Sequence, residues 1–308
     1  MKKVENKNCS EQPTIITIGT FDGVHIGHQK IIKKLTKTAK KSNLQSVVLT
    51  FFPHPRMVLQ QNADIKLLNT IDERLQILNS FGVQRTLVKT FTKDFSNLSA
   101  YDFVKKILVD ELNAKQIIIG YDHHFGKNRS ADINDLKRFG KQFNFKVEEI
   151  PEQDVNEVAV SSTKIRKALE SGDVSTANLY LGYPYFLTGT VIKGKGLGRQ
   201  MEFPTANIHI KEPYKLIPKN GVYVVKCTIN GILYFGMMNI GTNPTVGGKH
   251  QSIEVHFFDF DTDIYNQTIK VELLERLRDE HKFESVEVLK NQLKKDKVSA
   301  KLFIADYE

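Results

Sequence analysis

Short runs of β-branched and other apolar residues alternate with stretches of helical periodicity over the first 150 residues. The runs that predict strands are residues 14–19, 46–52, 85–90, 115–120 and 145–150. Between them, apolar side chains at helical spacing predict helix faces at Ile31, Ile32, Leu35 and Ala39, at Ile71, Leu75 and Leu78, and at Phe103, Ile107 and Leu108. This alternation predicts a Rossmann-like α/β domain, whose parallel sheet is covered on both faces and binds ligands at the carboxyl ends of its strands.

The pattern changes after Tyr183 and Pro184. Six short runs then predict antiparallel strands, at residues 186–194, 203–210, 221–229, 232–240, 252–260 and 268–274. Asn230-Gly231 between two of these runs is a strong signal for a tight hairpin turn. We therefore expect a six-stranded antiparallel barrel, followed by a helix over about 284–295. The predicted domains are residues 1–185 and residues 186–308.

Composition and charge narrow the class of protein. Of the 308 residues, 40% are hydrophobic and 26% are charged, a balance typical of globular proteins, and no window has the ~18 apolar residues of a membrane span. The N-terminus lacks the apolar segment of a secretory signal. Cys9 and Cys227 lie far apart and match no metal spacing, which favours a reducing cytosol.

The net charge is +9, and most of the excess lies in residues 1–186, where 27 Lys and Arg face 20 Asp and Glu. A basic surface attracts nucleic acid, and it attracts small polyphosphates equally well. The strands lack the interleaved aromatic and basic residues of RNA-binding motifs. We therefore expect no nucleic-acid partner, although a basic nucleic-acid-binding protein stays an alternative.

Gly19-Thr20-Phe21-Asp22-Gly23-Val24-His25-Ile26-Gly27-His28 follows the first predicted strand and leads into a helix. Glycines let backbone approach a ligand closely, and a helix N-terminus offers free N–H groups to an anion. Two imidazoles with Gly27 between them can face a triphosphate. A structural histidine or two ligands of a metal site are the alternatives, but no third ligand stands at a matching spacing.

Ser161-Ser162-Thr163-Lys164-Ile165-Arg166 stands at another predicted helix start. Hydroxyls, free backbone donors and two cations can clamp a polyphosphate. Taken alone, however, the segment is more typical of an ordinary N-cap followed by surface charges.

Together the two segments resemble the paired signatures of the HxGH nucleotidyltransferases. With TFFPHPR (50–56) and GYDHHFG (120–126), the chain is similar to bacterial bifunctional riboflavin kinase/FAD synthetases over nearly its whole length. The resemblance implies an FMN adenylyltransferase with catalytic His25, His28 and Arg166, ATP-binding Gly19, Phe21, Gly27, Ser162 and Thr163, and flavin-binding His54, Pro55, Asp122 and Phe125. Phe52 and His123-His124 depart from the residues usual in that family.

Gly194-Lys195-Gly196-Leu197-Gly198-Arg199 stands between two predicted strands and fits neither a Rossmann nor a P-loop motif. It precedes Pro204-Thr205-Ala206-Asn207, in which Thr205 and Asn207 share one face of a strand because side chains alternate. A hydroxyl and an amide oxygen so placed can hold Mg²⁺ against a nucleotide phosphate. On a later strand, Glu254 alternates with apolar neighbours and is either a general base or a surface carboxylate.

This half resembles the flavokinases, whose signature is the PTAN tetrapeptide. The resemblance implies ATP binding by Gly194, Gly196, Thr205 and Asn207, Mg²⁺ ligation by Thr205 and Asn207, and Glu254 as the catalytic base that acts on the ribityl 5′-hydroxyl. It also implies flavin contacts by Arg276 and Arg278. No arginine precedes Asn243-Pro244-Thr245, where this family usually has one. Glu202 replaces a usual glycine, so it either brings a carboxylate near the phosphates and hinders a positive φ, or points to solvent.

We therefore expect a bifunctional enzyme that phosphorylates riboflavin to FMN with ATP and then adenylylates FMN to FAD with release of pyrophosphate. It would use ATP as co-substrate and Mg²⁺ as cofactor, in the cytosol, without a membrane or an obligate protein partner. An FAD synthetase whose barrel retains little kinase activity is the alternative within the same class.

Overall fold

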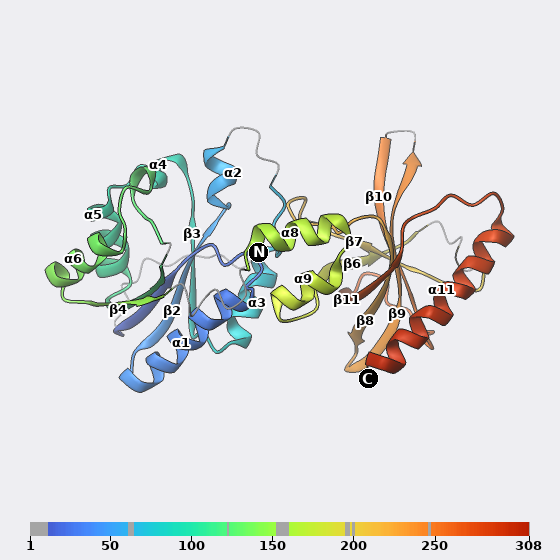
Figure 1. Ribbon diagram of the computed structural model, residues 1–308, viewed down its shortest axis with the longest axis horizontal. Helices are drawn as coiled ribbons and strands as arrows, with labels where there is room; N and C mark the ends of the chain where they lie inside the picture. The colour runs from blue at the N-terminus through green and yellow to red at the C-terminus, as the bar shows by residue number, and fades with distance from the viewer. Residues whose placement is uncertain are drawn as a thin grey trace. The chain divides into compact units, whose positions relative to one another are not determined.

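The computed structural model describes residues 12–60, 65–121, 123–151, 160–194, 198, 201–245 and 248–307, without the side chains of residues 243–245 and 248–250. The chain divides into two compact units, Met1–Ser161 and Ser162–Glu308. Each unit builds its own sheet and its own apolar core (Figure 1).

Unit 1 contains the parallel sheet that the sequence predicts. Its strands are β1 (Thr14–Ile18), β2 (Gln45–Phe52), β3 (Arg85–Thr90), β4 (Ala114–Gly120) and β5 (Lys146–Ile150). Their order across the sheet is β3-β2-β1-β4-β5, and every neighbouring pair is parallel. The carboxyl ends of all five strands therefore lie at one edge, and β1 is central.

Helices cover both faces of this sheet. They are α1 (Ile26–Ser42), α2 (Pro55–Leu59), α3 (Ile71–Ser80), α4 (Lys93–Ser96), α5 (Ala100–Asp102), the π-helix η1 (Phe103–Glu111), the 3₁₀-helix η2 (Lys127–Arg129) and α6 (Ile133–Phe143). Successive residues of β1 enter different cores: Ile15 packs with α1 and α3, and Ile16 packs with η1 and α6. The alternation of side chains along a strand thus explains why both faces need helices.

Unit 2 contains the closed antiparallel barrel that the sequence predicts. Its strands are β6 (Phe186–Ile192), β7 (Ala206–His209), β8 (Gly221–Ile229), β9 (Ile232–Thr245), β10 (Gly248–Phe257) and β11 (Thr268–Arg278), in the order β10-β7-β6-β11-β8-β9. Asn230 and Gly231 have φ angles of 51° and 82° between β8 and β9, which confirms the predicted tight turn.

Among the described residues, the barrel unit also contains the helices α8 (Ser162–Ser171), α9 (Val174–Leu181) and α11 (Val286–Tyr307). The last one runs beyond the expected 284–295 because Ala300, Phe303 and Ile304 pack with the barrel core. Among the helices of the described residues, none is long and apolar enough to cross a bilayer.

The two units divide before α8, earlier than the boundary expected near residue 185. The physical reason is the packing of α9 on the barrel. Asn178 Nδ2 donates to Leu273 O of β11 at 2.9 Å, and Asn178 Oδ1 accepts from Tyr185 N at 2.7 Å. The segment that begins at Ser162 is thus part of the barrel unit by its contacts.

Candidate functional site

The loop that follows β1 presents two stacked imidazoles at the start of α1. His25 is the N-cap of this helix, and its Nδ1 accepts from His28 N at 3.4 Å. The two rings stack with their centroids 3.7 Å apart. The rings of Phe21 and His28 pack edge to face, with their centroids 5.1 Å apart. The structure therefore brings together three residues that the sequence assigned to one site.

Three residues of this loop have left-handed backbone. Phe21, Gly23 and Val24 have φ angles of 48°, 82° and 37°. Glycine adopts this conformation readily, whereas a β-branched residue such as valine is strained there. Gly19 lies so close to Phe21 that an added Cβ would stand 3.0 Å from the ring. The glycine positions of the motif thus allow close packing within the loop.

Burial keeps both imidazoles uncharged at neutral pH. It lowers the pKa of His25 to about 4, and the nearby carboxylate of Asp22 opposes this shift. Burial also puts the pKa of His28 well below its usual range, and the charges of His25 and Arg74 lower it further. Within the described residues, His28 Nδ1 is buried without a hydrogen-bond partner. The loop therefore holds an imidazole nitrogen ready for a ligand.

The first predicted flavin segment is held by a helix cap. His54 is buried and is the N-cap of α2, and its Nδ1 accepts from Arg56 N at 3.2 Å. Pro55 opens the same helix, where its missing N–H costs nothing. A flavin contact at these residues stays a prediction.

In the second predicted flavin segment, Phe125 is buried in the core of unit 1. Phe125 is 7% exposed and its ring lies 5.9 Å from that of Phe103. Asp122 lies outside the described residues. Phe125 is thus part of the core of unit 1, and its contact with a flavin stays a prediction.

Ser162, Thr163 and Arg166 lie in the first turns of α8 and belong to unit 2. Thr163 is exposed and Arg166 is half-buried, whereas the apolar face of the helix is buried through Ile165, Ala168 and Leu169. The polar residues thus lie away from the buried apolar face of the helix, and their binding of a polyphosphate stays a prediction.

The barrel brings the predicted kinase residues together. Thr205 Oγ1 donates to Glu254 Oε2 at 3.2 Å. Asn207 lies directly opposite Glu254 in the pairing of β7 with β10. Gly194 approaches Asn207 so closely that an added Cβ would stand 2.1 Å from its Nδ2. Glu254 is half-buried between buried neighbours, as the alternation predicted.

The glycine loop is bonded to the PTAN segment. Gly198 O accepts from Phe203 N at 2.9 Å, and an added Cβ on Gly198 would stand 2.3 Å from Phe203 O. Gly196, which was assigned to ATP binding, lies outside the described residues.

Two further polar residues belong to this barrel site. Asn239 of β9 lies opposite Glu254 on the side away from Asn207. His256 Nδ1 lies 2.9 Å from Pro204 O, and this contact fixes the PTAN segment. His256 could have been found from the sequence, because it stands two residues after Glu254 and so shares one face of the strand with it. Asn239 could not, because no local pattern predicts the pairing of β9 with β10.

The two arginines assigned to flavin form ion pairs within unit 2. Arg276 Nη2 donates to Asn220 O and to Asp279 Oδ1, both at 2.7 Å. Arg278 pairs with the buried Asp296 of α11, with Nε 3.0 Å from each carboxylate oxygen. These contacts give both arginines a structural role, and their flavin contacts stay predictions.

At Glu202 the structure combines a feature of each expectation, a positive φ and a side chain exposed to solvent. Its φ angle is 67°, so the turn does require the positive φ that glycine adopts best. Its side chain is 75% exposed and lies 2.9 Å from Lys290 Nζ of α11. This hydrogen bond lowers the pKa of the carboxyl. The departure therefore costs backbone strain, and its carboxylate is paired with a lysine. The side chain of Asn243, the other departure in this half, lies outside the described side chains.

Family comparisons agree with this arrangement. The FAD synthetase family matches residues 7–164, and the riboflavin kinase family matches residues 181–304. With an α/β sheet in the first stretch and a closed barrel in the second, the fold and sites define a two-domain transferase of flavin cofactor synthesis.

Curated relatives cover nearly the whole chain. Bifunctional riboflavin kinase/FMN adenylyltransferases from Buchnera aphidicola subsp. Schizaphis graminum and from Listeria monocytogenes are each 39% identical, over 96% of this chain and 96% and 93% of theirs. The enzyme from Escherichia coli strain K12 is 34% identical over 96% of this chain and 95% of its own. The chain belongs to the bifunctional riboflavin kinase/FMN adenylyltransferase family.

A solved structure has the same fold. A crystal structure from Streptococcus pneumoniae, described as a macrolide-efflux protein, superposes with a TM-score of 0.86 and is 34% identical over 95% of both chains. That description concerns the Streptococcus protein, and the likeness supports the fold of this chain as an α/β sheet unit followed by a barrel unit.

Proposed function

We propose that this chain makes FMN from riboflavin and ATP in its barrel and then makes FAD from FMN and ATP in its α/β domain. The observation that carries the proposal is the contact of Thr205 with Glu254 beside Asn207, together with the stacked His25 and His28 at a helix start. Each of the two matched stretches of the chain thus contains one of the two proposed sites.

In the kinase step, the ribityl 5′-hydroxyl of riboflavin attacks the γ-phosphorus of ATP, and ADP leaves. Glu254 would accept the hydroxyl proton, since its half-buried carboxylate already accepts from Thr205. The Thr205 hydroxyl and the Asn207 amide offer the oxygen ligands that Mg²⁺ prefers, so these residues fit the ion. When bound, Mg²⁺ would neutralise charge on the phosphates.

In the adenylylation step, the FMN phosphate attacks the α-phosphorus of ATP in line, and pyrophosphate leaves. The step needs no nucleophile from the protein, so the residues act by position and charge. We propose that His25 and His28 face the phosphates and that Ser162, Thr163 and Arg166 bind the phosphate tail.

Chromatography of flavins after incubation with Mg-ATP tests the function. The purified chain should convert riboflavin to FMN and FAD, and should convert supplied FMN to FAD with one pyrophosphate released for each FAD. Formation of FAD from FMN without any FMN from riboflavin would favour the FAD synthetase with an inactive kinase. Absence of both products would contradict the proposal.

A further inference from the structure

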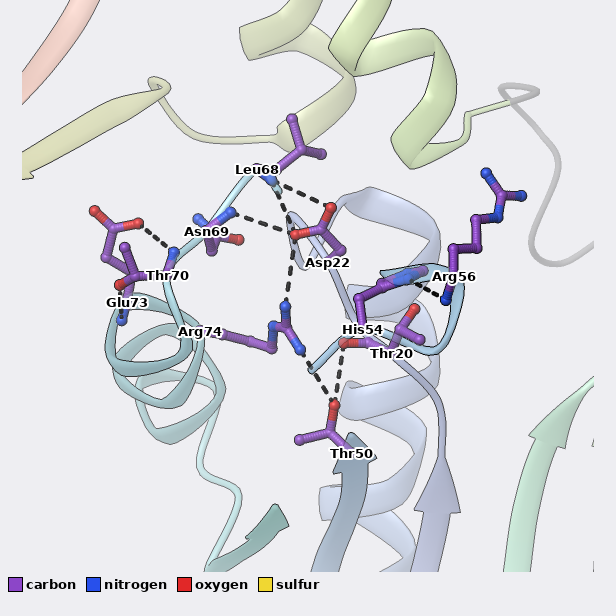
Figure 2. A network of polar contacts seen from close by, with 10 residues as sticks. All are labelled: Thr20, Asp22, Thr50, His54, Arg56, Leu68, Asn69, Thr70, Glu73 and Arg74. Atoms are coloured by element: carbon purple, nitrogen blue, oxygen red, sulfur yellow. Dashed lines mark hydrogen bonds and ion pairs between the residues drawn. The ribbon is translucent and has the colours of Figure 1, made fainter. Parts of the chain in front are cut away.

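Asp22 joins the loop before α1 to the start of α3. The side chain is 1% exposed, although a lone buried carboxylate is costly. Its Oδ1 accepts from Leu68 N at 3.0 Å and from Asn69 N at 3.3 Å, and its Oδ2 accepts from Leu68 N at 3.2 Å. Figure 2 shows this carboxylate between the two segments. The contacts join residues that lie 46 and 47 positions apart.

Arg74 of α3 compensates this charge. Its side chain is fully buried, and its Nη2 lies 3.6 Å from Asp22 Oδ1. On the other side of the guanidinium, Nη1 donates to Thr50 Oγ1 at 3.4 Å. Thr50 Oγ1 in turn donates to Thr20 O at 3.1 Å. One guanidinium thus forms an ion pair with Asp22 of the loop and reaches Thr20 of the same loop through hydrogen bonds by way of Thr50 (Figure 2).

The anchored loop is the one with strained backbone. Phe21 and Val24 adopt positive φ on either side of Asp22, and such residues persist only where the surroundings fix them. A buried ion pair adds little net stability, because desolvation of both charges offsets their attraction. Net stability alone therefore does not explain a fully buried arginine and aspartate beside this loop.

We propose that Asp22 and Arg74 are positioning residues for adenylyl transfer. Their ion pair holds the strained loop in the conformation that presents His25 and His28 to the nucleotide phosphates. This inference rests on the proposed function of the α/β domain.

The charges of the pair act on the two imidazoles in opposite directions. Asp22 raises the pKa of His25 against the larger effect of burial, and Arg74 adds to the lowering of the pKa of His28. The pair therefore influences the charge of the histidines as well as their position, which supports a role in the site.

The first test compares two matched variants. Asp22→Asn removes one charge but keeps an oxygen for the amides of the α3 start, and Asp296→Asn makes the same change in the buried Arg278–Asp296 pair of unit 2. Asp22→Asn should lower kcat for FAD formation from FMN by about tenfold or more, because misplacement of reacting groups by ~1 Å is that costly. KM for ATP should change by less than about threefold. Asp296→Asn should leave this kcat unchanged.

The second test uses Arg74→Lys and Arg74→Met, with the folded fraction measured by circular dichroism. Lysine keeps the charge but lacks the fork that reaches both Asp22 and Thr50, so kcat should fall in the order wild type, Lys, Met. Variants that lose stability but keep the wild-type kcat in their folded fraction would overturn the proposal. Failure of the unaltered chain to form FAD would instead contradict the proposed function itself.

Discussion

At the scale of single residues, the α/β site is made of groups whose burial costs free energy. His25 and His28 are stacked and uncharged, and Asp22 and Arg74 are charged and buried beside them. In the function proposed above, polyphosphate would bring negative charge to this place, and neutral imidazoles could then gain a proton or donate an N–H without prior desolvation of a cation.

This burial predicts an acid-sensitive stability. The pKa of His25 is about 4 in the folded chain and about 6.5 when unfolded, so the unfolded chain takes up a proton first as the pH falls. The free energy of unfolding should therefore decrease between pH 6.5 and pH 4, by up to about 3 kcal/mol from this residue. Urea unfolding followed by circular dichroism measures it.

His25→Gln should lose less stability than the unaltered chain over the same pH range. His209→Gln, which changes an exposed histidine of β7, is the matched control and should behave as the unaltered chain does. An identical pH dependence in all three proteins would show that His25 does not titrate as its burial implies.

The positions of several candidate site residues could be predicted from the sequence. Others could not, because they depend on tertiary contacts that leave no local pattern. The period of two along a strand set Glu254 among buried neighbours. Thr205 lies just before β7, which is shorter than the strand expected over residues 203–210, and meets Glu254 through a hydrogen bond. Asp22 and Arg74 meet only through tertiary structure, 52 positions apart, so no local pattern indicated their pairing.

At the scale of elements, Gly194 and Gly198, which follow β6, lie close to β7 and to the residues that lead into it. Gly194 lies against Asn207, and Gly198 O accepts a hydrogen bond from Phe203 N. Such close approach leaves no room for a Cβ, which explains the glycines better than conformational freedom does.

Gly194→Ala should therefore impair the kinase. Its Cβ would stand 2.1 Å from Asn207 Nδ2, so the amide must move away from its place opposite Glu254. We expect FMN formation to fall about tenfold or more. FAD formation from supplied FMN serves as the internal control and should not change. A kinase of normal rate would show that Asn207 acts from another position.

Glu202→Gly tests the strain in the same loop. Removing a left-handed non-glycine residue should raise the free energy of unfolding by about 1 kcal/mol. Because the carboxylate is already paired with Lys290, KM for ATP should change by less than about twofold. Lys290→Met removes only the ion pair and should change stability by less than about 0.5 kcal/mol. A several-fold gain in kinase efficiency in Glu202→Gly would show instead that the carboxylate repels the phosphates.

At the scale of the whole molecule, two compact units hold the two proposed reactions, but their boundary does not follow the change in sequence pattern. The shift from helical to strand periodicity lies near residue 185, whereas the contacts divide the chain before Ser162. Periodicity shows that α8 and α9 have apolar faces, but it does not show which core those faces meet. For the same reason, periodicity did not predict the full length of α11.

Two fragments test this boundary. Residues 162–308 keep α9, whose Ala177 and Leu181 are fully buried, and residues 186–308 expose the barrel surface under it. The shorter fragment should melt at least about 5 °C lower in calorimetry. Equal melting temperatures would show that α9 adds nothing to the barrel.

The most direct test of one reaction per site is to measure both reactions in two variants. His28→Ala should form FAD from FMN at least ~100-fold more slowly while it still phosphorylates riboflavin at the normal rate. Glu254→Gln should show the opposite, with FMN formation nearly lost and FAD formation from supplied FMN intact. If either folded variant lost both activities in parallel, or kept both, the assignment of the two reactions to two sites would be wrong.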